Sequence, residues 1–552
     1  MTYRTKLLHY FRQLDRGWLV SMIVLVCVVY LPFLGSPFVF DDIGLFHTGG
    51  IENYGNTLYE IKLRWLPYAS LAWTATLFRD APTHFYHLGN MLLHAGNVVL
   101  LFYLLRGLLG ITKAGPMQQR TIIWSALLAS LVFAAHPVAV YAVGYVIQRS
   151  ILMATFFTLV MQLAYLRAMM TGRERWLLLV VFAYFMAGFS KEHSVLIPAV
   201  MAAQHVLLLR NRNFFSQKKL GNSALWLCWG VMLLIAVFIT LLSKGVIGTA
   251  YEPMASEIFE QQNITATGTL LHVLSLLTQA GLFFKYMFLW LMPNPSWMSI
   301  DMREQFITEL TVWPGWLGVV AFGAYGFFSA RLLLRGGKQG LFGFALLYPW
   351  LLFLIEFTSI RVQEPFVLYR SYLWMPGLML LVPLLIIKFP TRLTFAAFIL
   401  LIFLLIPLSW NRLLTFSDNY RLWNDAAMLL DNEKIAGADR IFFNRGQAET
   451  KSQQWDKAVA DFLKVVRLSP NIVPARNELG KAYLNVGKYK EALEQFDVGI
   501  SKEPNEGNLN LGRGMALMRL HQKEQALQQL IKTCGLGEQT ACMLAGWMQH
   551  KK

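Results

Sequence analysis

The sequence predicts an all-α protein with two parts, a polytopic helical membrane domain followed by a domain of helical repeats. Three observations predict this class. The chain has 552 residues, of which 56% are hydrophobic and only 15% are charged, whereas soluble domains carry about a quarter charged residues. Apolar runs long enough to cross a bilayer recur through the first three quarters of the chain. Beyond these runs the composition becomes polar and a 34-residue period begins.

The first apolar run, Trp18 to Leu34, predicts a membrane anchor that the protein retains. The run follows the basic residues Arg4, Lys6, Arg12 and Arg16. A signal peptide would end in a small-residue cleavage site, whereas this run ends in proline and phenylalanine.

The net charge of +17 does not indicate a nucleic-acid partner, because most of the basic residues lie in short loops between apolar runs. Acid-poor basic loops stay in the cytoplasm according to the positive-inside rule. We therefore expect the N-terminus and these loops to be cytoplasmic. The loops lie at 106–120, 167–175, 210–219, 331–338 and 388–392.

Eleven membrane spans fit this charge pattern, which places the C-terminus outside the cytoplasm. The expected spans are about 18–34, 86–107, 121–140, 148–167, 175–189, 191–209, 224–243, 313–331, 340–358, 368–387 and 392–410.

One further apolar run, Leu270 to Met292, does not fit the alternation, because both of its flanks should lie outside. Lys285 near its middle also weakens it as a lipid-facing span. We expect a re-entrant or interfacial helix pair that is buried against protein. An ordinary twelfth span is the alternative.

The polar period after the last span predicts tetratricopeptide repeats. Glycines recur at 446, 480 and 514, alanines at 458, 492 and 526, and large apolar residues at 462, 496 and 530. Small residues let two helices cross closely while the large residue fills the groove between them. The predicted domains are a transmembrane catalytic domain at 1–414, an amphipathic connector at 415–438, and about three repeats with a capping helix at 439–552.

The stretch "FVFDD" places two adjacent carboxylates, Asp41 and Asp42, directly after the first span. Such a pair is often only a turn or a helix cap. Here the flanking residues are Phe38, Phe40, Ile43 and Phe46. Desolvation at the membrane surface would raise the pKa of at least one carboxyl group, which suits a general base.

The stretch "HFYHLGNMLLHAGN" places His87, Asn90 and His94 on one face of a helix. Paired histidines could bind a metal ion, but no carboxylate lies at ligand spacing on that helix. Hydrogen bonding between spans is therefore favoured. His87 lies nearest the outer surface and is expected to touch substrate.

Three cationic positions could meet an anion on the outer side. Arg149 enters a span, where it needs a carboxylate or a phosphate as partner. The turn "SKEH" holds Lys191, Glu192 and His193, where a local ion pair and a substrate role are equally supported. Arg370 in "EPFVLYRSYLWMPG" could snorkel at the interface or hold a phosphate.

These stretches together resemble the GT-C superfamily of membrane glycosyltransferases. They are most similar to the transmembrane and tetratricopeptide-repeat O-mannosyltransferases and their bacterial relatives. The matching stretches are "FVFDD", "YHLGNMLLHA", "FAAHPVAVYAVGYVIQRS", "SKEHSVLIPAVM" and "EPFVLYRSYLWMPG", followed by the repeats. Two stretches differ from the usual pattern, since "SKEH" replaces Lys-Glu-Thr and the last motif is loose.

The resemblance implies an inverting transfer of one sugar from a polyprenyl-phosphate carrier to a hydroxyl, on the face away from the cytoplasm. It implies that the catalytic base lies in the pair Asp41 and Asp42. The expected ligands of the donor phosphate are Arg370, Arg149 and Lys191. The expected substrate-binding residues are Arg64, His87, His136, Glu192, Glu364 and Tyr372. No metal is required if arginine and lysine neutralise a phosphomonoester, whereas a pyrophosphate carrier would favour a divalent cation.

A tetratricopeptide array binds extended peptides in its concave groove, so a protein acceptor is favoured over a glycan or lipid one. A scaffold for dimerisation is the bland alternative. Two other functions stay open: a transferase that acts on lipid A or a polysaccharide, and a non-catalytic assembly protein that docks a partner. The expected location is a bacterial inner membrane, with the N-terminus cytoplasmic and the repeats periplasmic.

The four cysteines are too few for a disulfide framework. Cys27 and Cys228 lie in apolar runs and are expected to be inert. Cys534 and Cys542 flank the short turn "GLGEQ" between two helices, which can bring them within disulfide distance. We expect a disulfide there, because an external domain permits it.

Overall fold

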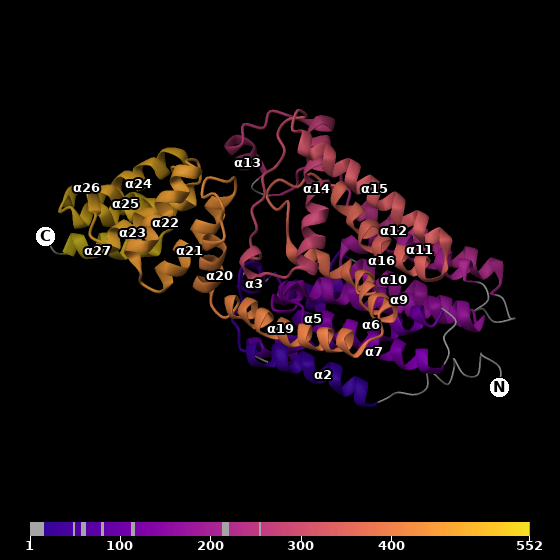
Figure 1. Ribbon diagram of the computed structural model, residues 1–552. Helices are drawn as coiled ribbons and strands as arrows, with labels where there is room; N and C mark the ends of the chain where they lie inside the picture. Colours follow the sequence, from indigo (N-terminus) through magenta and orange to yellow (C-terminus); the bar gives the residue numbers. More distant parts are fainter. Residues whose placement is uncertain are drawn as a thin grey trace. The chain divides into compact units, whose positions relative to one another are not determined.

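The computed structural model describes residues 16–47, 50–56, 62–78, 82–111, 116–211, 220–252 and 255–550. All regular elements among these residues are helices (Figure 1), which confirms the predicted all-α class. The basic residues Arg4, Lys6 and Arg12, and parts of the expected basic loops at 106–120 and 210–219, lie outside the described residues.

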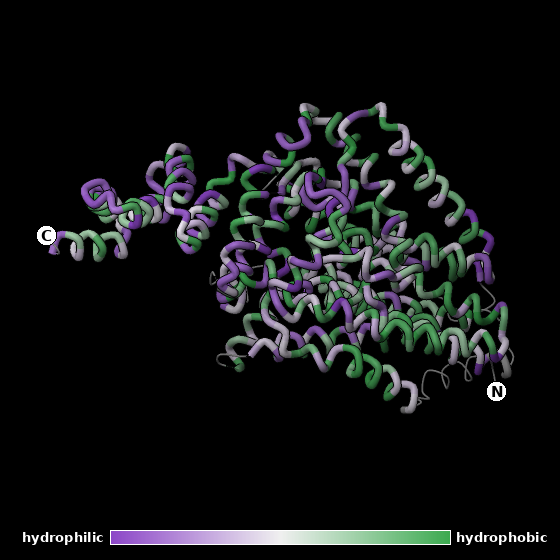
Figure 2. Tube along the Cα trace, turned by 60° about the vertical axis from the view of Figure 1, so that its left-hand side comes forward, coloured by the Kyte–Doolittle hydropathy of each residue, from purple (hydrophilic) through white to green (hydrophobic). Residues whose placement is uncertain are grey.

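The chain forms two compact units. The apolar unit comprises Met1–Glu252, Ala266–Ile300 and Phe306–Asp418, and the repeat unit comprises Pro253–Thr265, Asp301–Gln305 and Asn419–Lys552. Figure 2 shows hydrophobic residues along most helices of the apolar unit, and mainly hydrophilic residues on the C-terminal helices. This difference follows from the composition change read in the sequence.

The helices of the apolar unit form from runs of Leu, Val, Ile and Phe, in which every backbone polar group can pair inside its own helix. The longer helices are α2 (Arg16–Tyr30), α5 (Trp65–Leu77), α6 (Thr83–Leu109), α7 (Pro116–Ala134), α9 (Arg149–Thr171), α10 (Arg175–Ser190), α11 (Ile197–Arg210), α12 (Asn222–Leu242), α14 (Gly268–Leu291), α15 (Trp313–Arg335), α16 (Gly337–Phe353) and α19 (Arg392–Thr415). The shorter ones are α3 (Asp41–His47), α4 (Glu52–Gly55), α8 (Val140–Val143), α17 (Met375–Leu378) and α18 (Leu381–Lys388). Four 3₁₀ helices matter for the site: η3 (Val146–Gln148), η4 (Glu192–Leu196), η7 (Leu354–Phe357) and η8 (Leu368–Leu373).

Eight helices in the described part of the chain are long and apolar enough to cross a membrane. A ninth candidate is the pair Gln119–Ala134 and Pro137–Val143, which is bent by 50°. Three shorter apolar helices, Gly17–Phe33, Arg175–Ser190 and Met375–Lys388, lie where further spans were predicted. The positions of the expected spans therefore correspond to helices, while the number of crossings stays a prediction.

The segment that did not fit the alternation is one continuous helix, α14, so the predicted helix pair is wrong. No proline interrupts its 24 residues. The helix is bound along its length to the loop at 365–371. Gln279 Nε2 donates to the Pro365 carbonyl at 2.9 Å, Tyr286 Oη to the Val367 carbonyl at 3.0 Å, and Trp290 Nε1 to Ser371 Oγ at 2.9 Å. In Figure 1, α14 stands almost upright while α19 runs from side to side.

The repeat unit contains the predicted tetratricopeptide helices. After α20 (Asn419–Met428) come the helices α21 (Ala438–Lys451), α22 (Trp455–Leu468), α23 (Val473–Asn485), α24 (Tyr489–Lys502), α25 (Gly507–Arg519), α26 (Lys523–Gly535) and α27 (Gln539–His550). A Cβ atom at Gly480 would lie 2.6 Å from the Phe496 ring, and one at Gly446 would lie 2.8 Å from Phe462. Only glycine fits these crossings, so the predicted register is confirmed.

Two short segments from the N-terminal three quarters of the chain belong to the repeat unit. One is α13 (Ala255–Gln261), whose Gln261 donates from Nε2 to Ser469 Oγ at 2.6 Å. The other carries Asp301, whose Oδ2 lies 2.8 Å from Arg440 Nε and 2.6 Å from Arg303 Nη2. Long-range polar pairs of this kind leave no mark in local composition.

The predicted disulfide between Cys534 and Cys542 is present. The two Cα atoms lie 4.7 Å apart, across the turn between α26 and α27. Cys27 and Cys228 are free, as expected.

Candidate functional site

The acidic pair opens helix α3 directly after a strained backbone position. Phe40 has φ of 50°, in the left-handed region that bulky side chains rarely adopt. The rings of Phe38 and Phe46, which precede and follow this position in the chain, stack on each other with centroids 4.1 Å apart. Strain of this kind persists only where the surroundings over-determine it, which is typical of functional sites.

The two carboxylates have different surroundings. Asp42 is fully buried, its Oδ1 accepting a hydrogen bond from the Ile147 amide at 2.8 Å and its Oδ2 one from the Val39 amide at 3.4 Å. Burial, together with the smaller effect of the Asp41 charge, raises the pKa of Asp42 to about 8. Asp41 is exposed, and its amide donates to the Tyr145 hydroxyl at 3.0 Å. Asp41 is therefore the carboxylate of the pair that solvent reaches, while Asp42 anchors the loop to η3.

A cluster of four cations, which we call the cation cluster, lies on η4, η8 and the loops beside them. Its members are Arg64, Lys191, Arg361 and Arg370. Arg64 also has a left-handed backbone, with φ of 61°. Its guanidinium pairs with both carboxylate oxygens of Glu192, one contact being Nε to Oε2 at 2.9 Å.

The cation cluster has two halves: Arg64 binds Glu192, and Arg361 and Arg370 bind the buried carboxylate of Glu356. Its Oε2 lies 3.0 Å from Arg361 Nε and 3.3 Å from Arg370 Nη1. Arg370 also donates to the Glu364 carbonyl at 3.2 Å, and its Nη2 lies 3.8 Å from the Glu364 carboxylate. Burial opposes the charge on Arg370, but Glu356 and its other neighbours hold the pKa of Arg370 well above its usual value.

Lys191 is the cation whose charge the protein compensates least. The residue is 4% exposed, and its ammonium lies 5.7 Å from the centre of the Tyr369 ring. Within the described residues no carboxylate lies within 4.0 Å of the ammonium. Burial, together with the smaller effect of the Arg64 charge, lowers the pKa of Lys191 to about 7. A buried ammonium with this environment would be stabilised by an incoming anion.

Tyr369 connects the acidic pair to the cation cluster. Its ring lies 6.3 Å from the ring of Tyr145, the residue that binds the Asp41 backbone. Burial raises the pKa of Tyr369, and so do the charges of Glu364 and Asp41, whereas Arg370 and Arg64 lower it. Both charge clusters therefore act on the same half-buried phenol.

The sequence reasoning missed four residues of this site: Glu252, Glu356, Arg361 and Tyr369. Glu356 could have been found, because a carboxylate inside the apolar run "LLFLIEF" is costly unless it is paired. Glu252 has no such signal. Its carboxylate accepts the amides of Val362, Gln363 and Glu364 at 2.8, 2.6 and 3.1 Å, and so shapes the loop that carries Arg361.

Arg149 was expected to meet a carboxylate or a phosphate, and its role at the donor phosphate stays a prediction. Neutral acceptors satisfy its guanidinium: Asn90 Oδ1 at 3.0 Å from Nε, the Tyr86 carbonyl at 2.8 Å from Nη2, and Ser70 at 3.3 Å from Nη1. The structure places Arg149 where it joins α5, α6 and α9, and it shows no contact between Arg149 and the cation cluster.

Two of the expected substrate-binding residues are bound inside the core. His136 Nε2 lies 3.1 Å from the Trp290 carbonyl, and its Nδ1 accepts the Val138 amide at 3.3 Å as a helix cap. The hydroxyl of Tyr372 is held by His94 at 2.6 Å and by Asn97 at 3.2 Å, and its side chain is fully buried. These contacts give both residues a structural role, and their expected contact with substrate stays a prediction.

His87 lies beneath the acidic loop, with Nε2 3.1 Å from the Ser36 carbonyl. The residue is 5% exposed, so its side chain contacts the loop from the protein interior. Arg64 is a member of the cation cluster, Glu192 pairs with Arg64, and the Glu364 carboxylate lies near Arg370. The expected hydrogen bonding of His94 between spans is confirmed.

No group of three potential metal ligands from His, Cys, Asp and Glu occurs in the described ranges. The absence of a metal requirement stays a prediction.

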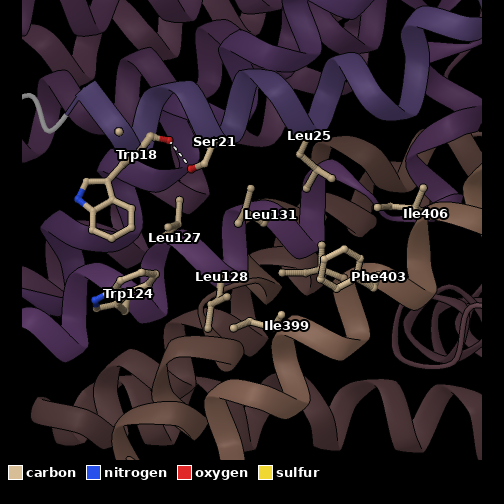
Figure 3. Close-up of a pocket in the computed structure, with 12 residues that line it drawn as sticks. Trp18, Ser21, Leu25, Trp124, Leu127, Leu128, Leu131, Ile399, Phe403 and Ile406 are labelled. Atoms are coloured by element: carbon tan, nitrogen blue, oxygen red, sulfur yellow. Dashed lines mark hydrogen bonds between the residues drawn. The ribbon is translucent and has the colours of Figure 1, made fainter. Parts of the chain in front are cut away.

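An apolar pocket lies elsewhere in the apolar unit, among α2, α7 and α19 (Figure 3). Its volume is about 480 Å³, and no charged side chain lines it. The Ser21 hydroxyl donates to the Trp18 carbonyl of its own helix at 2.9 Å. This pocket therefore lacks the groups needed for acid–base or phosphate chemistry, and the acidic pair with the cation cluster remains the candidate active site.

Fold and site together define an all-α protein with many membrane-length helices, a buried charged site and a tetratricopeptide solenoid. Among curated proteins the chain is 24% identical over 449 residues to Protein O-mannosyl-transferase TMTC3 of Homo sapiens, a match that covers 76% of this chain and 46% of the relative. It is 39% identical over 70 residues to the Peroxisomal targeting signal receptor of Candida albicans, which covers 12% of each chain. The chain thus spans less than half the length of these curated relatives.

No protein-family model matches the sequence. Among solved structures, the Arabidopsis OM64 TPR domain is similar over 20% of this chain and 95% of its own, with 20% identity and a TM-score of 0.20, which is too low to support an argument. The likeness to TMTC3 supports the resemblance to transmembrane and tetratricopeptide-repeat proteins. The wider likeness to GT-C enzymes and to bacterial relatives stays a prediction.

Proposed function

We propose that this protein is a membrane glycosyltransferase that moves one sugar from a polyprenyl-phosphate carrier to a hydroxyl of a protein. One observation carries the proposal. The exposed carboxylate of Asp41 and the cation cluster both act on Tyr369, and in that cluster the charge of Lys191 has no close carboxylate partner among the described residues. The likeness to a protein O-mannosyl-transferase agrees with this chemistry and favours mannose among the sugars.

The reaction divides between the two clusters. The Asp41 carboxylate takes the proton of the acceptor hydroxyl while that oxygen attacks the anomeric carbon. The bond between the anomeric carbon and the phosphate oxygen breaks, and its electron pair leaves with the phosphate. Lys191 and Arg370 stabilise the negative charge that builds on this oxygen. Attack opposite the leaving group inverts the anomeric configuration.

The repeats supply the acceptor in this proposal. A tethered peptide-binding array raises the local concentration of a protein near the membrane. The disulfide between Cys534 and Cys542 supports an oxidising compartment for the repeats. In a bacterium this compartment would be the periplasm, outside the inner membrane. A phosphatase reporter fused after Lys552 should be active if this orientation is right, and a reporter that fluoresces only in the cytoplasm should stay dark.

The direct test uses the purified full chain in nanodiscs with undecaprenyl-phosphate-mannose and a panel of envelope proteins from a deletion strain. Mass spectrometry should find new hexose on serine or threonine of specific proteins. If sugar instead appears on lipid A or a polysaccharide, the acceptor class is wrong while the transferase remains.

A chain with its repeats exchanged for unrelated ones separates the remaining alternatives. Loss of protein glycosylation, with donor binding retained, supports repeats that select the acceptor. If mutants of both aspartates retain full biological function, the protein is a non-catalytic assembly factor.

A further inference from the structure

We infer that His193 is a positioning residue that couples the two halves of the cation cluster. Its Nδ1 lies 3.6 Å from Glu192 Oε1, and its Nε2 lies 3.3 Å from Glu356 Oε1. The side chain of His193 is 5% exposed, so solvent does not reach this bridge freely. The inference rests on the proposed function, because it assigns His193 to the alignment of the donor phosphate.

Each carboxylate that His193 contacts holds a different part of the cluster. Glu192 binds the Arg64 guanidinium through both of its oxygens. Glu356 binds Arg361 and Arg370. The imidazole therefore lies between the acid that orients one arginine and the acid that orients the other two.

The sequence separation of these groups explains why a coupling residue is needed. Arg64 precedes α5, Glu192 begins η4, and Glu356 lies on η7, so no single element fixes their relative positions. A carboxylate held on one side only could rotate and carry its arginine with it. Contacts to one rigid imidazole keep the two carboxylates, and hence the cations, in a prearranged geometry for the phosphate.

Lys191 gives this coupling a functional consequence. It is two residues before His193 in the same turn, and it lacks a carboxylate partner among the described residues. The backbone that places its ammonium is the one that His193 secures against Glu356. Loss of the imidazole should therefore disturb donor binding, while the acceptor side around Asp41 keeps its own contacts to Tyr145.

The experiment compares His193→Ala and His193→Gln with the control His205→Ala. His205 lies on α11, which follows η4, and its ring contacts the Tyr165 hydroxyl away from the cluster. Transfer from undecaprenyl-phosphate-mannose is measured in nanodiscs at varied donor and acceptor concentrations. Binding of undecaprenyl phosphate alone is measured by thermal shift.

We expect His193→Ala to raise the donor KM about 10- to 100-fold, because a small misplacement of positioning groups can cost about 10²-fold. The acceptor KM should stay unchanged. The amide of His193→Gln can still reach Glu356, so it should recover most of the donor affinity. His205→Ala should leave the donor KM unchanged.

The outcomes separate this inference from the proposed function. If the wild type transfers sugar and His193→Ala keeps the wild-type donor KM, the coupling role is wrong and the proposed function stands. Equal losses in all three variants would indicate general destabilisation and would also reject the role. If the wild type neither transfers sugar nor binds undecaprenyl phosphate, both proposals fail. Should His193→Ala not fold, the comparison of His193→Gln with wild type decides, since a coupling residue predicts a raised donor KM with little change in kcat.

Discussion

The carboxylate of Asp42 accepts a hydrogen bond from the amide of Ile147 at 2.8 Å, which ties the start of α3 to η3. This contact joins two stretches that are 105 residues apart in the chain. Because Asp42 is committed to the backbone, its neighbour Asp41 is left on the accessible side of the same turn. The contact thus gives two residues of identical chemistry different surroundings.

Replacing the exposed carboxylate should abolish catalysis without unfolding the protein. Asp41→Asn removes the proton acceptor, so kcat should fall by about 10²- to 10⁴-fold, as for other general bases. The donor KM should hardly change, because the cation cluster is intact. Turnover with undecaprenyl-phosphate-mannose measures this effect, and near-normal turnover would exclude Asp41 as the base.

The buried carboxylate should make stability depend on pH. In the folded protein Asp42 has a pKa near 8, compared with an ordinary value of 3.8, so the folded state binds one more proton between these pH values. The contribution of Asp42 to the free energy of unfolding is therefore fully present below about pH 4 and is lost as the pH rises towards 8. The melting temperature of the wild type, relative to Asp42→Asn, should fall from pH 5 to pH 8.

Asp41→Asn provides the matched control, since it removes the adjacent charge from the same loop. The melting temperature of Asp41→Asn should change with pH nearly as that of the wild type does between pH 5 and pH 8. If the melting temperature of Asp42→Asn also follows that of the wild type across this pH range, the Asp42 carboxyl group is not protonated in the folded protein.

The charge on Lys191 should set the upper pH limit for donor capture. With a pKa near 7 in the free protein, the ammonium loses its proton as the pH rises, and the attraction for phosphate weakens. The value of kcat/KM for the donor should fall above about pH 7, since it reports the free enzyme. Lys191→Arg keeps its charge and should move this fall to higher pH.

The Asp42→Asn protein serves as the control for the Lys191 titration, because the pKa of Asp42 lies nearby. The fall in kcat/KM should persist in that variant. If Lys191→Arg and the wild type share the same pH profile, another group controls donor capture.

Arg370 should contribute both charge and geometry to donor binding. Arg370→Ala should raise the donor KM by about 10- to 100-fold, as for lost hydrogen bonds to a charged group. Arg370→Lys should lose less, because it keeps the charge but not the planar fork. Donor affinity that is unchanged in Arg370→Ala would show that the arginine serves only Glu356 and Glu364.

The terminal disulfide should stabilise the capping helix α27. Replacing both Cys534 and Cys542 with serine should cost about 2–3 kcal/mol for so short a loop. Hydrogen exchange over residues 539–550 of the full chain should become faster, while exchange in α21–α24 stays as in the wild type. Two freely alkylated thiols in the non-reduced wild type would contradict the disulfide and weaken the external placement of the repeats.

The sequence by itself determined the elements and their repeats. The apolar runs predict the helices of the apolar unit, because a run of Leu, Val and Phe must bury its backbone polarity in a helix. The spacing of Gly446, Gly480 and Gly514 predicts the solenoid, since only glycine allows these crossings. The acidic pair, Lys191 and Arg370 were predicted from charges that are costly near a membrane.

Tertiary structure alone decided how these charges are paired. Sequence could not tell Asp41 from Asp42, because the difference arises from the distant amide of Ile147. It also gave Arg149 an anionic partner, whereas neutral oxygens from α5 and α6 satisfy it. Glu356 and His193 meet each other only because η7 and η4, which are far apart in the chain, pack together. The cost of burying a charge is local and can be read from sequence, but the partner that compensates it is chosen by packing in three dimensions.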